Sequence, residues 1–432
     1  MVRRVLLVIF ALATASVIAA QGSRRTVVVQ VVDRVRPAVV NLTARQVVNV
    51  RRRSLFGDLF PEFAPPGSQA YSSQSLGTGV VISADGTIVT NEHVIEGAAE
   101  VKVKFLTGKE VDAEVIGSDA DADLAVLRVP LKGLAFIALA DQEDSMIGET
   151  VIAIGNPLGL ENTVTVGVLS ARDRTINSSS THRTYTDFLQ TDASINPGNS
   201  GGALVDLDGR LIGINTAIIG DAQGIGFAIP ARRVHRIVND LLRYGQVQPA
   251  WLGLFVRSRG EGRRGAGGAG GVEIVDVFQD SPAARAGLHK GEIISTGNGR
   301  PLTSRDDFAT LVAQLAPGER VTLGTSGEGP RTVELRASKP PADIGEQILT
   351  RAVGIRLQDK GRRVVVARVT PDSPADETGL AAGDVILQIN GERVASVAGV
   401  NPIIARSLSR SSLLLVVQRG RYAYQLPFPL AM

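Results

Sequence analysis

One short run constrains this chain more than any other: Gly198-Asn199-Ser200-Gly201-Gly202. Glycines on both sides of a serine let the backbone turn sharply enough to expose the hydroxyl group. A serine placed in this way is a candidate nucleophile, but it needs a histidine as general base and a carboxylate to orient that base. The motif therefore predicts that a histidine and an acidic residue fold next to Ser200.

Two upstream segments supply candidates for these partners. The chain has only four histidines, and His93 ends an apolar β-type run, which suits a base held where a strand meets a turn. Asp123 lies where a short acidic loop enters another apolar run, and Asp121 is the alternative carboxylate. The order His, Asp, Ser matches chymotrypsin-like enzymes and differs from α/β-hydrolases and subtilisins.

These segments resemble the HtrA (Deg) family of serine proteases. The resemblance is carried by residues 90–94, 121–127 and 190–204, continues through 224–230, and covers most of residues 75–430. It implies a serine endopeptidase of mainly β structure, with a chymotrypsin-like double β-barrel and the catalytic residues His93, Asp123 and Ser200. Asp123 is preferred over Asp121 because it directly precedes Leu124-Ala125, as the family's aspartate does.

A serine protease site also needs an oxyanion hole and a pocket for the substrate side chain. Negative charge develops on the scissile carbonyl oxygen in the transition state, and backbone amides can stabilise it. The predicted oxyanion hole consists of the amides of Gly198, Asn199 and Ser200. The resemblance implies that the pocket for the substrate side chain, which favours small aliphatic residues in this family, is lined by Ile225, Gly226 and Phe227.

The pattern of short apolar runs predicts the extent of the protease domain. From about residue 75 to 230, such runs alternate with Gly, Asp and Asn turns, which is typical of β-barrels. Apolar residues from Val234 to Leu242 then recur at helical spacing, and Gly245 stands where a C-cap glycine is expected. We therefore expect a protease domain at 76–245, preceded by an N-terminal segment and mobile loop at 21–75.

Two related segments follow the protease domain. Residues 281–294 parallel residues 373–386, and Asn298-Gly299 and Asn390-Gly391 fall at matching offsets as hairpin turns. They resemble PDZ domains, which are β-rich α+β folds, and are expected at 246–338 and 339–432.

PDZ domains bind an extended peptide C-terminus by strand addition and hold its carboxylate with backbone amides. The resemblance identifies two carboxylate-binding loops: Leu252, Gly253 and Leu254, and Val353, Gly354 and Ile355. The first repeat also carries a Gly-rich insertion at 260–271, so we expect the second repeat to bind peptides more tightly.

The N-terminus resembles an export signal. Arg3 and Arg4 precede an apolar run at 5–20, which is short for a membrane span, and small residues at Ala19 and Ala20 permit cleavage. This predicts a signal peptide at 1–20 and a periplasmic protein, with an inner-membrane anchor as the alternative.

Composition excludes several other kinds of site. The chain has no cysteine, so neither a disulfide nor a thiolate metal site is possible, and no His-Glu-x-x-His motif or carboxylate cluster predicts a metal or other cofactor. The formal charge is only +3, and the basic cluster at 51–53 is short and lacks neighbouring aromatic residues. Nucleic acid is therefore not expected as a partner.

The resemblance implies an ATP-independent protease that degrades unfolded or damaged proteins captured by its PDZ domains. Alternatives are a chaperone or scaffold on the same fold, or a membrane-anchored stress-signalling protease. A homotrimer or a multiple of trimers is also implied. Three aromatic residues in an otherwise polar loop, which would be costly to expose singly, suit a subunit contact: Phe56, Phe60 and Phe63.

Overall fold

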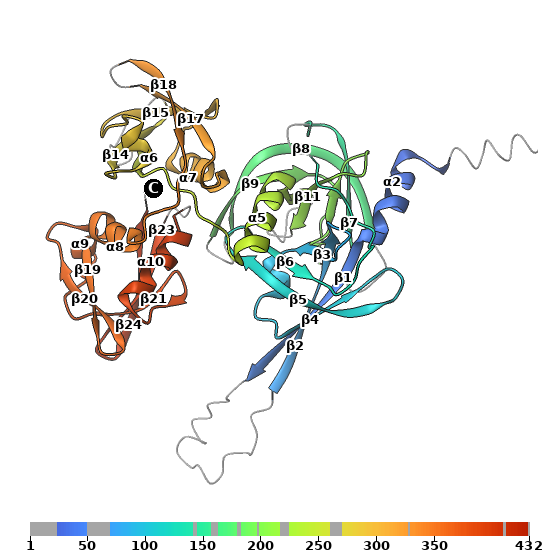
Figure 1. Cartoon of the computed structure of the whole chain (residues 1–432), viewed down its shortest axis with the longest axis horizontal. Coiled ribbons are helices and arrows are strands. Elements are labelled where there is room, and N and C mark those ends of the chain that lie inside the picture. Colours follow the sequence, from blue (N-terminus) through green and yellow to red (C-terminus); the bar gives the residue numbers. More distant parts are fainter. Residues whose placement is uncertain are drawn as a thin grey trace, which may run out of the picture. The chain divides into compact units, whose positions relative to one another are not determined.

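The computed structural model describes residues 24–49, 70–140, 145–156, 163–178, 183–196, 198–216, 224–259, 270–326, 329–408 and 412–430. The chain divides into two compact units, residues 1–246 and 247–432, and we treat each separately (Figure 1). The predicted signal peptide, the aromatic residues of the N-terminal loop and most of the Gly-rich insertion lie outside the described residues. Within these residues, no helix is both long and apolar enough to cross a bilayer.

The first unit begins with an amphipathic helix, α2 (Val27–Val35), which buries Val31 and Val35. Thr26 caps this helix, because its hydroxyl accepts a hydrogen bond from the Val29 amide. A single 3-10 turn, η1 (Arg36–Ala38), leads into the first strand.

Six strands close the first barrel in the order β1-β2-β3-β6-β5-β4, with β4 pairing back onto β1. Their bounds are β1 (Val39–Asn49), β2 (Ala70–Val81), β3 (Thr87–Thr90), β4 (Glu100–Lys104), β5 (Glu110–Asp119) and β6 (Leu124–Arg128). The barrel thus starts well before residue 76, the predicted start of the protease domain. The reason is that β1 fills the place between β2 and β4 and buries Val40 and Leu42 in the core.

The second barrel has the order β10-β11-β12-β9-β8-β7. Its strands are β7 (Thr150–Gly155), β8 (Thr163–Ser178), β9 (Arg183–Thr191), β10 (Ala203–Val205), β11 (Leu211–Thr216) and β12 (Gly226–Pro230). The predicted helix follows as α5 (Ala231–Tyr244), and Gly245 ends it in the left-handed conformation with φ of 69°. The two closed barrels confirm the predicted fold class.

The second unit contains two sheets with the same topology, as the sequence repeat predicts. The first repeat consists of β13 (Leu254–Ser258), β14 (Val272–Val277), α6 (Pro282–Arg285), β15 (Ile293–Gly297), β16 (Arg300–Pro301), α7 (Arg305–Gln314), β17 (Arg320–Ser326) and β18 (Pro330–Arg336). The second consists of α8 (Ile344–Ile348), the π-helical turn η5 (Leu349–Val353), β19 (Ile355–Lys360), β20 (Arg363–Val369), α9 (Pro374–Glu377), β21 (Val385–Ile389), β22 (Glu392–Arg393), α10 (Val397–Arg406), β23 (Ser412–Arg419) and β24 (Tyr422–Pro429).

Matching residues produce matching local structure in the two repeats. Ser281 and Ser373 cap α6 and α9, each followed by a proline at the first helical position. Asn298 and Asn390 adopt positive φ angles of 47° and 50° ahead of their glycines, as the predicted hairpin turns require. The two repeats also touch, since the Arg351 guanidinium bonds to Asp276 at 3.1 Å.

Candidate active site

His93 and Asp123 meet at the edge of the first barrel. His93 lies in the short helix α4 (Glu92–Ile95), which directly follows β3, and Asp123 lies in the turn before β6. The imidazole Nδ1 is 2.8 Å from Oδ1 and 2.9 Å from Oδ2 of Asp123. The His93 backbone amide also donates to Oδ1 at 3.1 Å. Asp123, the preferred candidate, is therefore the carboxylate that bonds to the imidazole Nδ1.

Two further residues fix Asp123. The Asn91 side-chain amide donates to the Asp123 carbonyl oxygen at 2.9 Å, which supports the left-handed backbone of that aspartate, with φ of 53°. The Thr216 hydroxyl donates to Oδ2 at 3.0 Å from the end of β11 in the second barrel. Sequence reasoning missed Thr216, because a threonine at a strand end carries no recognisable signal.

The side chains of Asp123 and His93 differ in burial. The Asp123 side chain is 6% exposed, whereas the His93 side chain is 44% exposed. A buried carboxylate that accepts several hydrogen bonds holds the ring on one side and leaves the other side of the imidazole open to a reactant.

The pKa of His93 is raised above the ordinary value for histidine. Burial of the ring works against this shift, because it favours the neutral form. The hydrogen bond and negative charge of Asp123 outweigh burial, and the charges of Glu92 and Glu96 act in the same direction. His93 is thus a stronger base than an isolated histidine.

The Ser200 turn is fastened to both barrels. The Ser200 carbonyl accepts a hydrogen bond from the Thr78 amide of β2 at 3.0 Å, and the Gly201 amide donates to Asn215 of β11 at 2.9 Å. A Cβ atom at Gly201 would lie 2.1 Å from the Thr78 carbonyl oxygen, and φ at Gly201 is 80°. Only glycine lets the backbone at position 201 come this close to Thr78, which explains the glycine that follows Ser200 in the motif.

One of the three amides of the predicted oxyanion hole is already bonded within the serine turn. The Asn199 amide donates to the Asn196 carbonyl at 2.9 Å, so this N–H closes a turn and is not directed at a substrate. The turn is secured from the first barrel as well, because the Thr78 hydroxyl donates to the Gly198 carbonyl at 2.6 Å. The amides of Gly198 and Ser200 remain as candidates.

The three residues predicted to line the substrate pocket differ in exposure and packing. Phe227 is 7% exposed and packs edge-on against Phe188, with 6.2 Å between ring centroids, so it belongs to the packed interior. A Cβ at Gly226 would lie 2.5 Å from Ile195 Cγ1, which brings Ile195 against this glycine. Sequence reasoning missed Ile195, although it lies five residues before Ser200. Ile225 is 43% exposed.

The two predicted carboxylate loops share one backbone conformation. Gly253 and Gly354 have φ angles of 82° and 88°, and a Cβ at either would clash with the helix-capping serine of its repeat. The loops differ in one donor. The Gly354 amide bonds to the Leu349 carbonyl at 2.8 Å, whereas the Gly253 amide has no such partner among the described residues.

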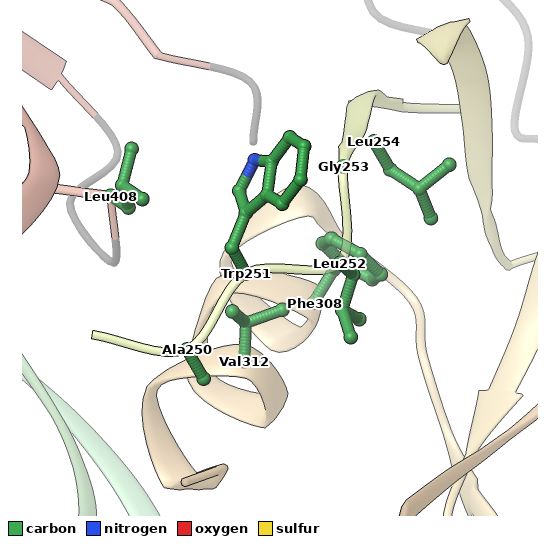
Figure 2. Close-up of a pocket in the computed structure, with 8 residues that line it drawn as sticks. All are labelled: Ala250, Trp251, Leu252, Gly253, Leu254, Phe308, Val312 and Leu408. Atoms are coloured by element: carbon green, nitrogen blue, oxygen red, sulfur yellow. The ribbon is translucent and has the colours of Figure 1, made fainter. Parts of the chain in front are cut away.

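A small cavity of about 10 Å³ adjoins the first loop, and Figure 2 shows the side chains that line it. The lining residues are Ala250, Trp251, Leu252, Gly253, Leu254, Phe308, Val312 and Leu408. Phe308 and Val312 come from α7, so apolar side chains lie beside the predicted carboxylate loop, although the space between them holds no more than about one water molecule.

Comparisons with known proteins agree with this geometry. Residues 77–214 match the trypsin-like peptidase domain family, and residues 250–330 and 352–426 match the PDZ domain family. The periplasmic serine endoprotease DegP of Escherichia coli (strain K12) is 35% identical, covering 95% of this chain and 94% of its own length. The periplasmic serine endoprotease DegP of Salmonella typhimurium (strain LT2) is 38% identical over 82% of this chain and 76% of its own length.

A solved structure is similar as well. The HtrA-type protease AlgW with decapeptide is 36% identical, covers 72% of this chain and 98% of its own, and has a TM-score of 0.53. Similarity to a serine endoprotease extends over nearly the whole chain. The chain therefore belongs to the HtrA (Deg) family of serine endoproteases.

Proposed function

We propose that Ser200, His93 and Asp123 form the catalytic triad of this endopeptidase. The observation that carries the proposal is the pairing of an accessible imidazole with a buried, multiply bonded carboxylate. Because Nδ1 faces Asp123, Nδ1 holds the ring proton and Nε2 accepts the proton of the Ser200 hydroxyl. The Ser200 oxygen then bonds to the scissile carbonyl carbon, and His93 returns the proton to the leaving amine.

The remaining steps use the backbone of the serine turn. The amides of Gly198 and Ser200 stabilise the oxyanion, and water deprotonated by His93 releases the acyl group from Ser200. Ile195, packed against Gly226, narrows the pocket and supports a preference for small aliphatic side chains.

We further propose that the protease acts on unfolded or damaged proteins in the periplasm. The relatives named as periplasmic endoproteases support this location, and their similarity extends through both PDZ repeats. The carboxylate-capturing role fits the first repeat better than the second, because the Gly354 amide is already bonded to Leu349. This reverses the order of affinities expected from the sequence.

Assembly into homotrimers or multiples of trimers is proposed from the family resemblance. The aromatic residues expected at the subunit contact, Phe56, Phe60 and Phe63, lie outside the described residues. Light scattering on the active protein measures the mass directly, and a monomer with full activity would contradict a trimer.

Replacement of the proposed nucleophile tests the catalytic assignment. Ser200→Ala is expected to lower cleavage of unfolded casein by at least about 10⁴-fold, because loss of the nucleophile removes the acyl-transfer route. Ser118→Ala, at an exposed position on β5, is the matched control and should cleave at the normal rate. Unchanged cut sites and rates in purified Ser200→Ala protein would disprove the assignment.

A further inference from the structure

Strands β19 and β20 of the second PDZ repeat are labelled in Figure 1. Their sequence carries an unusual charge pattern. Five cationic residues lie on this two-stranded ribbon and its turn: Arg356, Lys360, Arg362, Arg363 and Arg368. We call them the basic ribbon. All five are exposed, and within the described part of the chain none forms an ion pair.

Two pairs of like charges face each other across the ribbon. Arg356 is directly opposite Arg368, and Lys360 is directly opposite Arg363. Like charges in such cross-strand positions destabilise a sheet, by up to about 1 kcal/mol for each pair. Folding alone therefore does not explain this arrangement, whereas an anion bound between the cations would offset the repulsion.

On the described strands of the corresponding ribbon in the first repeat, the charged side chains are paired. Alignment of the two carboxylate loops matches Phe255 with Arg356, and Phe255 is opposite Asp276. Arg351 pairs with Asp276 at 3.1 Å, and Arg257 pairs with Glu273 at 2.9 Å. On the described strands of the two ribbons, unpaired cations are therefore found in the second repeat and not in the first.

The basic ribbon borders an open hollow of about 370 Å³. Its lining consists of Lys360, Arg362, Arg363, Val365, Gly383 and Val385. Val365 and Val385 are paired across β20 and β21, so they form an apolar floor beneath a cationic rim. Such a surface accommodates an anionic group together with the aliphatic stem that carries it.

We propose that the basic ribbon binds acidic, extended polypeptide segments of protein substrates. Arg356, Gln358 and Lys360 alternate along β19, and alternate residues of a strand lie about 7 Å apart on one face. An extended peptide repeats its own side chains at the same interval, whereas a compact ion would occupy only one end of the ribbon. The inference rests on the proposed function, since the acidic segments are assigned to substrates.

Binding to the full-length Ser200→Ala protein tests the proposal without cleavage. The probe is a short fluorescent peptide that alternates glutamate and threonine and ends in an amide, so the carboxylate loops play no part. It is expected to bind, to weaken with salt, and to bind more tightly than its glutamine counterpart. The triple variant Lys360→Gln, Arg362→Gln, Arg363→Gln should weaken binding by about tenfold.

The matched control removes the same charge elsewhere. Lys104→Gln, Lys109→Gln, Lys132→Gln changes three exposed lysines of the first unit and should leave the affinity unchanged. If the ribbon triple fails to fold, Arg356→Gln, Arg368→Gln, which removes a repulsive pair, takes its place. Equal affinity in ribbon and control variants would overturn the proposal.

Loss of binding only to anionic phospholipid vesicles, with peptide affinity intact, would also overturn the proposal and assign the ribbon to a membrane surface. The proposed function is tested separately by casein cleavage with the wild-type chain. If the ribbon variants leave peptide binding unchanged while the wild-type chain cleaves casein, the docking site is contradicted and the protease assignment stays intact.

Discussion

The proposed catalytic site, at the junction of the two barrels, and the two predicted carboxylate loops hold their functional groups by different means. At the junction, side chains from both barrels converge on Asp123, with His93 and Thr216 bonded to its two oxygens. In the two predicted carboxylate loops, the proposed donors are backbone amides beside Gly253 and Gly354, and the Gly354 amide is already bonded to Leu349. Single substitutions should therefore abolish chemistry at the junction but only weaken binding at the loops.

The largest effect is expected from Asp123→Asn. The asparagine preserves shape, but it cannot hold Nδ1 protonated and stabilise the imidazolium, so kcat should fall by about 10⁴-fold. Asp121→Asn is the matched control, because the imidazole Nδ1 bonds to the carboxylate of Asp123, and this variant should retain nearly full kcat. Steady-state cleavage of a small aliphatic peptide substrate measures kcat of both variants. Similar losses of kcat in the two would contradict the special role proposed for Asp123.

A smaller effect is expected at the first carboxylate loop. Val312→Ala removes apolar contact from the cavity beside Gly253, so an apolar peptide with a free C-terminus should bind about fivefold more weakly. Ile404→Ala makes a related change on α10 of the second repeat and should leave the affinity unaltered.

Calorimetric titration of full-length Ser200→Ala variants distinguishes the two loops. The amidated form of the same peptide should bind weakly to every variant. Dependence on Ile404 in place of Val312 would return carboxylate capture to the second repeat.

The smallest effect concerns pH. His93 must be neutral to accept the Ser200 proton, so kcat/KM should fall as pH drops through the raised pKa of His93. Glu92→Gln, Glu96→Gln removes two charges that raise this pKa, and the acidic limb should move to lower pH by a few tenths of a unit at low salt. Glu100→Gln is the control. A shift of the acidic limb to higher pH in the Glu92→Gln, Glu96→Gln variant would contradict the electrostatic cause.

Much of this architecture could be predicted from the sequence because the signals are local. The serine motif, the order of His93 and Asp123 and the repeated turn residues each occupy a few consecutive positions. Asn298 and Asn390 illustrate this well, since asparagine before glycine specifies a hairpin turn without long-range help.

The features that sequence reasoning missed depend on contacts between distant segments. Thr216 reaches Asp123 across 93 positions, and β1 joins the barrel only because β2 and β4 leave a place for it. The engagement of Asn199 in a turn and of Gly354 with Leu349 depends on where single backbone amides point. A residue type does not encode that direction.

The site of covalent labelling by a fluorophosphonate tests the central claim most directly. The probe bonds to a serine oxygen that a neighbouring base has activated, so peptide mass spectrometry identifies the nucleophile. A single adduct on Ser200 is expected in the native wild-type chain, with none in Ser200→Ala and little in His93→Ala. An adduct on a different serine, or undiminished labelling of Ser200→Ala, would contradict the assignment of Ser200 as the nucleophile.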